Sequence, residues 1–257
     1  MIKKVFTLVL LTLTLSGCNK LMQIASQLPN INTTIPGVVT NNDNISGLKS
    51  SLNVGISSAV GLLGQENGFL NNESLKILFP QEAKAIIDNI KYIPGGEELV
   101  NKAVVSLNRS AEDAVKEALP IFKNAITSMS ISDATGILFG NDNAATEYLR
   151  KTTYTQLKSA FAPKVKLSLD KALVAGVSTS ETWNLLTTNY NKAAQSTIGS
   201  IAGLKTVNVN IEEYVTNKAL DALFVRIAAE EKEIRTNPAA RINDILKKVF
   251  GQLDKKK

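Results

Sequence analysis

The sequence predicts an all-α fold, an irregular multi-helix bundle of about eight to ten helices. From Ile45 onward, apolar residues recur at intervals of three and four, beginning with Leu48, Leu52 and Ile56, which is the period of an α-helix. A β-like alternation occurs only in residues 204–210, and one short segment cannot form a sheet with itself. We therefore expect that segment to be an extended connection between helices.

The chain starts with an expected export signal at residues 1–17. Lys3 and Lys4 form a basic start, and the apolar stretch that follows, residues 5–15, is too short to span a bilayer as a mature helix. Leu15, Ser16, Gly17 and Cys18 then resemble the bacterial lipobox, in which cleavage occurs before a cysteine that carries diacylglycerol. The resemblance implies a lipoprotein, a substrate for palmitate labelling, with Cys18 as the lipid attachment site.

Lipid on Cys18, the single cysteine, would anchor the chain to a membrane without a spanning helix. Asn19 stands where enteric lipoproteins retained at the inner membrane carry aspartate, so we expect the cell envelope, with an outer-membrane anchor facing the periplasm. Residues 18–44, rich in asparagine and poor in charge, are expected to be the acylated cysteine and a flexible tether of about 25–30 Å. A single helical domain at 45–251 and a basic tail at 252–257 would follow.

The helical domain is expected to contain one long helix that ends before Pro120. Six apolar residues at helical spacing would form its buried face: Leu99, Ala103, Leu107, Ala111, Ala114 and Ala118. A shorter helix with Phe122 and Ile126 follows. Thr153 with Gln156, and Ser178 with Glu181, have the spacing of capping boxes at helix starts. Asn237 before Pro238 predicts the start of the last helix, which Gly251 would close.

Composition excludes several kinds of chemistry. The chain has no histidine, and Cys18 is committed to lipid, so histidine-dependent triads, zinc sites and thiol catalysis are ruled out. We expect no cofactor and no metal. The net charge is +6, but six of the 29 basic residues lie outside 45–251, leaving the helical region nearly neutral. With few aromatic residues as well, the chain lacks the pattern of a nucleic-acid-binding protein.

Several segments together resemble a bacterial family named domain of unknown function 4197, over roughly residues 45–251. The matching segments are Gly47-Leu48-Lys49, Asn53-Val54-Gly55-Ile56, Ser106-Leu107-Asn108-Arg109, Asp142-Asn143-Ala144-Ala145-Thr146-Glu147-Tyr148, Tyr214-Val215-Thr216, Ala219-Leu220-Asp221 and Asn237-Pro238-Ala239-Ala240-Arg241. The resemblance implies a helical, exported, often lipid-anchored domain of unknown activity.

Two short patterns have a functional and a structural interpretation. Residues 140–143 (Gly-Asn-Asp-Asn) could form half of a calcium site, but they lack EF-hand spacing, and a helix cap and turn explains them better. Glu73-Ser74 resembles the catalytic pair of lytic transglycosylases, whose other elements are missing. Glu73 fits the first turn of a helix after Asn72 instead.

The helix from Ile211 is apolar on every side between residues 219 and 229, which predicts burial. Asp221 and Arg226, its charges there, would then need partners on other helices, and Arg150 and Tyr148, near the turn that contains Asp142, are candidates. We interpret these five residues as a buried polar cluster or a ligand site. The following charge run, with Glu230, Glu231, Glu233, Lys232 and Arg235, is expected to be a solvated face.

Three functions fit these observations. The first is a non-enzymatic module that binds an envelope protein or a small ligand through its helical surface. The second is a carboxylate-dependent hydrolase of cell-wall glycan, which a recessed glutamate with a raised pKa would favour. The third is a structural spacer, which a surface with no pocket and no exposed apolar patch would favour.

Overall fold

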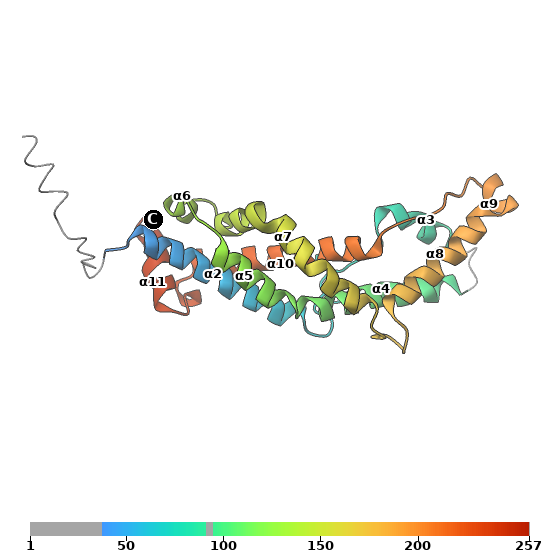
Figure 1. Cartoon of the computed structure of the whole chain (residues 1–257), viewed down its shortest axis with the longest axis horizontal. Coiled ribbons are helices and arrows are strands. Elements are labelled where there is room, and N and C mark those ends of the chain that lie inside the picture. Colours follow the sequence, from blue (N-terminus) through green and yellow to red (C-terminus); the bar gives the residue numbers. More distant parts are fainter. Residues whose placement is uncertain (1–37, 91–94, 257) are drawn as a thin grey trace, which may run out of the picture. The chain divides into compact units, whose positions relative to one another are not determined.

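The computed structural model describes residues 38–90 and 95–256, and in these ranges the chain forms ten α-helices and no strand, which confirms the predicted fold class (Figure 1). The helices are α2 (Asn41–Leu63), α3 (Lys84–Asp88), α4 (Gly96–Val115), α5 (Ala118–Ser128), α6 (Ala134–Leu138), α7 (Ala144–Leu169), α8 (Thr179–Gln195), α9 (Thr197–Ile201), α10 (Ile211–Thr236) and α11 (Asp244–Phe250). Short 3₁₀ turns occur at Gln81–Ala83, Pro238–Ala240 and Leu253–Lys256. None of the described helices is long and apolar enough to cross a membrane. The expected signal, Cys18 and most of the tether lie outside the described residues.

The first described helix, α2, begins four residues before the expected start of the domain. Thr40 and Asp43 form a capping box, in which the Thr40 hydroxyl accepts from the Asp43 amide at 3.1 Å and the Thr40 amide donates to the Asp43 carboxylate at 2.8 Å. Asn41 and Asn42 are exposed helical residues, so they add nothing to the apolar period. The prediction that the tether extends to Asn44 was therefore wrong at its last residues.

Two glycines on α2 allow close packing of three helices. α2 lies alongside α10, and α11 and α5 also pack against it (Figure 1). A Cβ on Gly47 would lie 2.6 Å from the Cβ of Val249 on α11, and a Cβ on Gly55 would lie 3.0 Å from a methyl carbon of Ile227 on α10. Because both positions lack a side chain, the core residues of α10 and α11 reach the backbone of α2.

The long helix predicted before Pro120 is present as α4 and ends at Val115. Of its predicted apolar face, Ala103, Leu107, Ala111 and Ala114 are buried and Leu99 is partly buried. Ala118, also predicted on this face, is buried but belongs to the next helix. The shorter helix is α5, which begins at Ala118 and buries Phe122 and Ile126 as expected. Pro120 falls within the first turn of α5, where its missing N–H leaves no intrahelical hydrogen bond unmade.

Of the three helix starts predicted from capping residues, only the one at Ser178 is confirmed. Ser178 and Glu181 form the predicted capping box at the start of α8. Thr153 does not start a helix, because it lies inside α7 and its hydroxyl donates to the Leu149 carbonyl at 2.6 Å. Asn237 caps only the 3₁₀ turn Pro238–Ala240, whereas Asn243 caps α11, which Gly251 ends.

Residues 204–210 form the predicted extended connection between α9 and α10. The side chain of Asn191 on α8 holds it, since its amide accepts from the Val207 N–H at 2.8 Å and donates to the Val207 carbonyl at 2.9 Å. An asparagine side chain thus replaces the neighbouring strand that this segment lacks.

Candidate functional site

The predicted polar cluster is reduced to one ion pair between two helices. Arg150 on α7 binds the carboxylate of Asp221 on α10, and the Arg150 guanidinium lies 5.3 Å from the ring centre of Tyr154 and 5.2 Å from that of Phe224. The Arg150 and Asp221 side chains are 38% and 45% exposed. The expectation that Asp221 is buried was therefore wrong, because α10 has an outward face at this level, on which Val225 is also exposed.

The other members of that cluster lie apart from the pair. The Tyr148 hydroxyl donates to the Ser130 carbonyl at 2.8 Å. Asp142 is exposed, 3.9 Å from the Lys232 ammonium, and Arg226 is partly buried with no ion pair among the described residues. Within the described part of the chain, no group of three acidic, histidine or cysteine side chains could hold a metal ion.

The charge run at the end of α10 contains the most deeply buried carboxylate among the residues that the structure describes, which corrects the prediction of a solvated face. Glu231 is fully buried, and its carboxylate accepts from the amides of Ala145 and Thr146 at 2.9 and 2.7 Å. It also accepts from the Thr146 hydroxyl at 2.6 Å and from Arg235 Nε at 2.8 Å. Glu231 therefore caps the N-terminus of α7, a role that we had expected of the turn at residues 140–143.

Two arginines join the end of α10 to its surroundings. Arg235 donates to the carbonyls of Leu138 and Ile137 at the end of α6, at 2.6 and 3.0 Å. Arg241 donates to the Ile234 carbonyl at 3.0 Å and forms a two-bond pair with Asp254, at 2.6 and 2.9 Å. Part of the expected basic tail is thus a 3₁₀ turn fixed to the domain.

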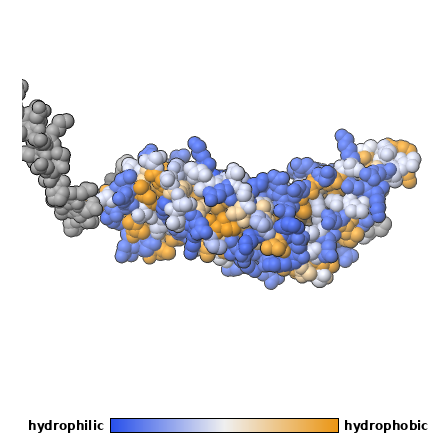
Figure 2. All heavy atoms as spheres, viewed as in Figure 1, coloured by the Kyte–Doolittle hydropathy of each residue, from blue (hydrophilic) through white to orange (hydrophobic). Residues whose placement is uncertain are grey.

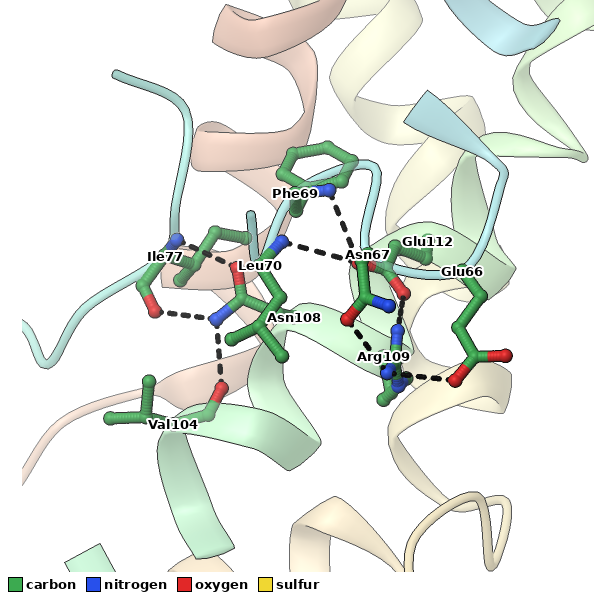
Figure 3. A network of polar contacts seen from close by, with 9 residues as sticks. All are labelled: Glu66, Asn67, Phe69, Leu70, Ile77, Val104, Asn108, Arg109 and Glu112. Carbon is green, nitrogen blue, oxygen red and sulfur yellow. Dashed lines mark hydrogen bonds and ion pairs between the residues drawn. The ribbon is translucent and has the colours of Figure 1, made fainter. Parts of the chain in front are cut away.

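A second network, drawn in Figure 3, holds the segment between α2 and α3 against α4. The buried side chain of Asn108 accepts from the Ile77 amide at 2.9 Å and donates to the Ile77 carbonyl at 2.8 Å. The Glu112 carboxylate accepts from the amides of Phe69 and Leu70 at 3.1 and 3.3 Å, and from Arg109 at 2.6 Å. Both carboxylate oxygens of Glu112 already accept hydrogen bonds. The network therefore serves to hold the loop between α2 and α3 in place.

Glu73 lies in the same segment but not in a helix. Asn72 forms a turn in which its side-chain oxygen accepts from the Ser74 amide at 3.2 Å and from the Ser74 hydroxyl at 2.8 Å. The Glu73 side chain is exposed on this turn. The expectation of a helix start here was therefore wrong, and Glu73 is not recessed as a proton donor would be.

An open groove of about 810 Å³, lined mostly by residues with polar side chains, lies where α2, α5 and the segment before α11 meet. α2 contributes hydroxyl and amide groups at helical spacing, namely Ser46, Ser50, Asn53, Ser57 and Ser58. Lys49 and Val54 of α2, Lys123 and Thr127 of α5, and Ile242 and Asn243 complete the lining. No acidic residue is among these groove residues.

Hydrogen bonds fix part of this lining. The Lys49 ammonium donates to the Thr127 carbonyl at 2.7 Å, which holds it across the groove from α2 to α5. The Asn243 amide donates to the Ser50 hydroxyl at 3.1 Å. Among the residues that the structure describes, neither Lys49 nor Lys123 forms an ion pair, and both lysines belong to the lining.

The fold and these networks define an all-α domain whose helix ends are joined by buried charged and amide side chains. A family model described as "Protein of unknown function (DUF4197)" matches residues 38–251, and the chain belongs to this family. No curated protein and no solved structure matched the chain. The segments that carried the resemblance include Gly47, Asn108, Arg109, Thr146 and Arg241, to which the structure gives packing or hydrogen-bonding roles.

Proposed function

We propose that this chain is a lipid-anchored, non-enzymatic module of the cell envelope, and that it binds a small anionic, hydroxyl-bearing ligand in the groove between α2 and α5. The observation that carries the proposal is the lining of that groove: two lysines, several hydroxyl and amide groups, and no carboxylate. The groove is shallow and open to solvent, with a volume of about 810 Å³, so it would hold a small ligand through its polar groups rather than by enclosing it.

The chemistry of the lining selects for an anion. Ammonium groups form charge-assisted hydrogen bonds with carboxylates and phosphates, which are stronger than bonds between neutral partners. Serine and asparagine side chains both donate and accept, so they match the hydroxyl groups of a polyol. Lys49, held by Thr127, is pre-positioned and retains donors for a ligand.

The anchor part of the proposal rests on the lipobox at residues 15–18. Replacement of Cys18 by alanine should block lipid attachment and leave an unprocessed precursor in cells. Incorporation of radiolabelled palmitate into the parent chain, and its loss in Cys18→Ala, would support the anchor. Palmitate that still enters Cys18→Ala would contradict it.

Ligand binding can be tested by titration calorimetry of the detergent-solubilised full chain with glycerol phosphate, and with uncharged glycerol for comparison. We expect saturable binding of glycerol phosphate only. The double substitution Lys49→Gln and Lys123→Gln should weaken that binding by at least tenfold, about 1.4 kcal/mol. Binding that is equally strong in this variant would contradict the proposed site.

The matched control is Lys76→Gln with Lys151→Gln, which removes the same charge from two exposed lysines outside the groove. This control should bind like the parent chain. An equal loss in both double variants would show that the affinity reflects only the overall charge of the protein.

The two recessed glutamates of the described residues, Glu112 and Glu231, do not favour the hydrolase alternative, because backbone amides and an arginine occupy both carboxylates. A general acid for glycoside cleavage needs a raised pKa. In the described part of the chain, the carboxyl groups with displaced pKa values, Asp43, Asp113, Asp170, Glu181 and Glu213, all have lowered ones. For Asp113, burial raises the pKa, but hydrogen bonds from Lys171 and Ser168 outweigh it.

A further inference from the structure

The short helix α9 presents two isoleucines almost completely to solvent. Ile198 and Ile201 are 80% and 83% exposed, more than any other large apolar side chain of the described residues. Figure 2 shows apolar atoms at the end of the domain where Figure 1 places α9. Residues three apart on a helix are neighbours, so the two isoleucines form one exposed apolar tip. Exposed apolar patches are a feature of membrane and protein contact sites.

The backbone of α9 fixes the direction of these side chains. Gly199 is the buried residue of α9, and a Cβ there would collide with the Ala193 carbonyl oxygen at the end of α8. The side of α9 that carries Gly199 therefore faces α8, and Ile198 and Ile201 are left on the outer side.

Local hydrogen bonds hold both ends of this helix. The Ser196 hydroxyl accepts from the Gly199 amide at 3.0 Å, and the Leu204 amide donates to the Gly199 carbonyl at 2.9 Å. Gly203 adopts φ +71°, which closes the turn after the helix and favours glycine. The outward isoleucines thus belong to an ordered turn with its own caps.

The charged residues of the chain segment that carries α9 are all positive. From Thr182 to Ile211 the sequence contains no acidic residue, and its only charged residues there, Lys192 and Lys205, stand on either side of α9. Both lysines are exposed, and neither forms an ion pair among the described residues. An apolar tip between two lysines without ion pairs is complementary to a surface with an anionic outer layer and an apolar layer beneath it.

We infer that α9 is a membrane-contact element that inserts Ile198 and Ile201 into the surface of a lipid bilayer with anionic headgroups. Apolar side chains at such a surface enter the boundary between headgroups and acyl chains, and nearby lysines are attracted by the negative surface potential. The nearest carboxylates in sequence, Glu181 and Glu212, lie outside this segment. This contact is separate from the ligand groove and from the lipid on Cys18.

The test places an environment-sensitive fluorophore next to the isoleucines of the full chain. Ser200→Cys, in a chain that also carries Cys18→Ala, is labelled with a nitrobenzoxadiazole group and mixed with vesicles. With phosphatidylcholine–phosphatidylglycerol vesicles, the emission should rise several-fold and shift to shorter wavelength. With pure phosphatidylcholine the change should be clearly smaller.

Two comparisons make the result specific to α9. The same fluorophore at Ser159→Cys, an exposed position on α7, should show no change, although the rest of the chain is identical. Adding Ile198→Asn and Ile201→Asn to the Ser200→Cys chain should abolish the rise. Both isoleucines are exposed, so these substitutions should leave the circular dichroism melt unchanged.

Three results would overturn the inference. The first is no emission change at position 200 with anionic vesicles, and the second is a change that persists after Ile198→Asn and Ile201→Asn. The third is a rise that depends on protein concentration without vesicles, which would identify a second copy of the chain as the occupant.

Discussion

The carboxylate of Glu231 and the guanidinium of Arg235 form an ion pair one turn apart on α10, with side chains only 0% and 3% exposed. Glu231 also accepts from two amides at the start of α7, and Arg235 donates to two carbonyls at the end of α6. One buried pair therefore satisfies the free backbone groups of two other helix ends. Through these hydrogen bonds, Glu231 and Arg235 of α10 connect this helix to α7 and α6.

Glu231→Ala should strongly destabilise the domain. The substitution would leave the Arg235 cation buried without its partner and the first amides of α7 without an acceptor. Loss of one member of a buried pair typically costs about 3–5 kcal/mol, a large part of a usual stability of roughly 5–15 kcal/mol. Urea denaturation followed by circular dichroism measures this loss.

The control for this prediction is Glu233→Ala, two residues further along α10 and exposed. Exposed substitutions of this kind usually change stability by no more than about 0.5 kcal/mol. Equal midpoints for Glu231→Ala and the parent chain would contradict the structural role of Glu231.

Two glycines of the same helix should respond to alanine in opposite directions. At Gly47 a Cβ would lie 2.6 Å from Val249, and overpacking of this kind typically costs about 1–3 kcal/mol. At Gly61, also on α2, a Cβ would meet nothing within 4 Å, and alanine favours a helix by up to about 1 kcal/mol over glycine. Thermal melts should therefore give a lower midpoint for Gly47→Ala and a higher one for Gly61→Ala. A raised midpoint for both would mean that α11 does not pack on α2 at this point.

Asp221→Ala should have a small effect, because the pair with Arg150 is open to solvent. Exposed ion pairs contribute about 0.2–1 kcal/mol, and Arg150 keeps its contacts with Tyr154 and Phe224 when the carboxylate is removed. The effect should also shrink as salt is raised, since ions screen exposed charges. A loss as large as that of Glu231→Ala in the same denaturation series would show that Asp221 is buried in solution.

The fold class was predictable because helical periodicity depends only on the order of apolar residues along the chain. The same periodicity predicts that Glu231 is buried. The buried stripe of α10 has residues at intervals of three and four, and Glu231 is one of them: Leu220, Leu223, Ile227, Glu231 and Ile234. The charged residues on either side of Glu231 gave the segment the pattern of a solvated face, although Glu231 itself occupies a core position. The helical period, continued to the end of α10, predicts the burial of Glu231 correctly, whereas the cluster of charges does not.

Local spacing was less reliable at helix boundaries. Thr153 and Gln156 have the spacing of a capping box, yet Leu149, Leu157 and Phe161 continue one buried face through them, so α7 does not stop there. The polar start of α2 gave no apolar signal at all. Capping residues satisfy backbone groups only where a helix actually begins, and their spacing alone does not establish a start.

The groove and the pairings of buried groups were not predictable from local patterns. The groove joins residues of α2 and α5 with Asn243, which are far apart in the sequence, and only tertiary packing brings them together. Arg150 was a candidate partner for Asp221, and the structure does bring the two together. Burial of that pair depends on how α7 and α10 are rotated, which the sequence does not specify.

Asp43 should make the stability of the domain depend on acidic pH. Hydrogen bonds from the Thr40 backbone amide, from Lys248 and from the Thr40 hydroxyl lower the pKa of Asp43 from 3.8 to about 2. Because the folded-state pKa is below the unfolded one, the contribution is fully present above pH 3.8 and is lost as the pH falls through about 2. Lys248 lies on α11, 2.9 Å from the carboxylate, so the pair also connects the first and last α-helices of the described chain.

Asp43→Asn should therefore melt below the parent chain at neutral pH, and the gap between the two midpoints should narrow as the pH falls from 3.8 toward 2. Asparagine keeps the size of the side chain and an oxygen that can accept from Thr40, but it lacks the charge that Lys248 and the start of α2 stabilise. Glu73→Gln is the matched control, since Glu73 is exposed and forms no ion pair among the described residues. Its midpoint should follow that of the parent at every pH. A gap for Asp43→Asn that stays constant across this pH range would mean that its effect does not come from the ionised carboxylate.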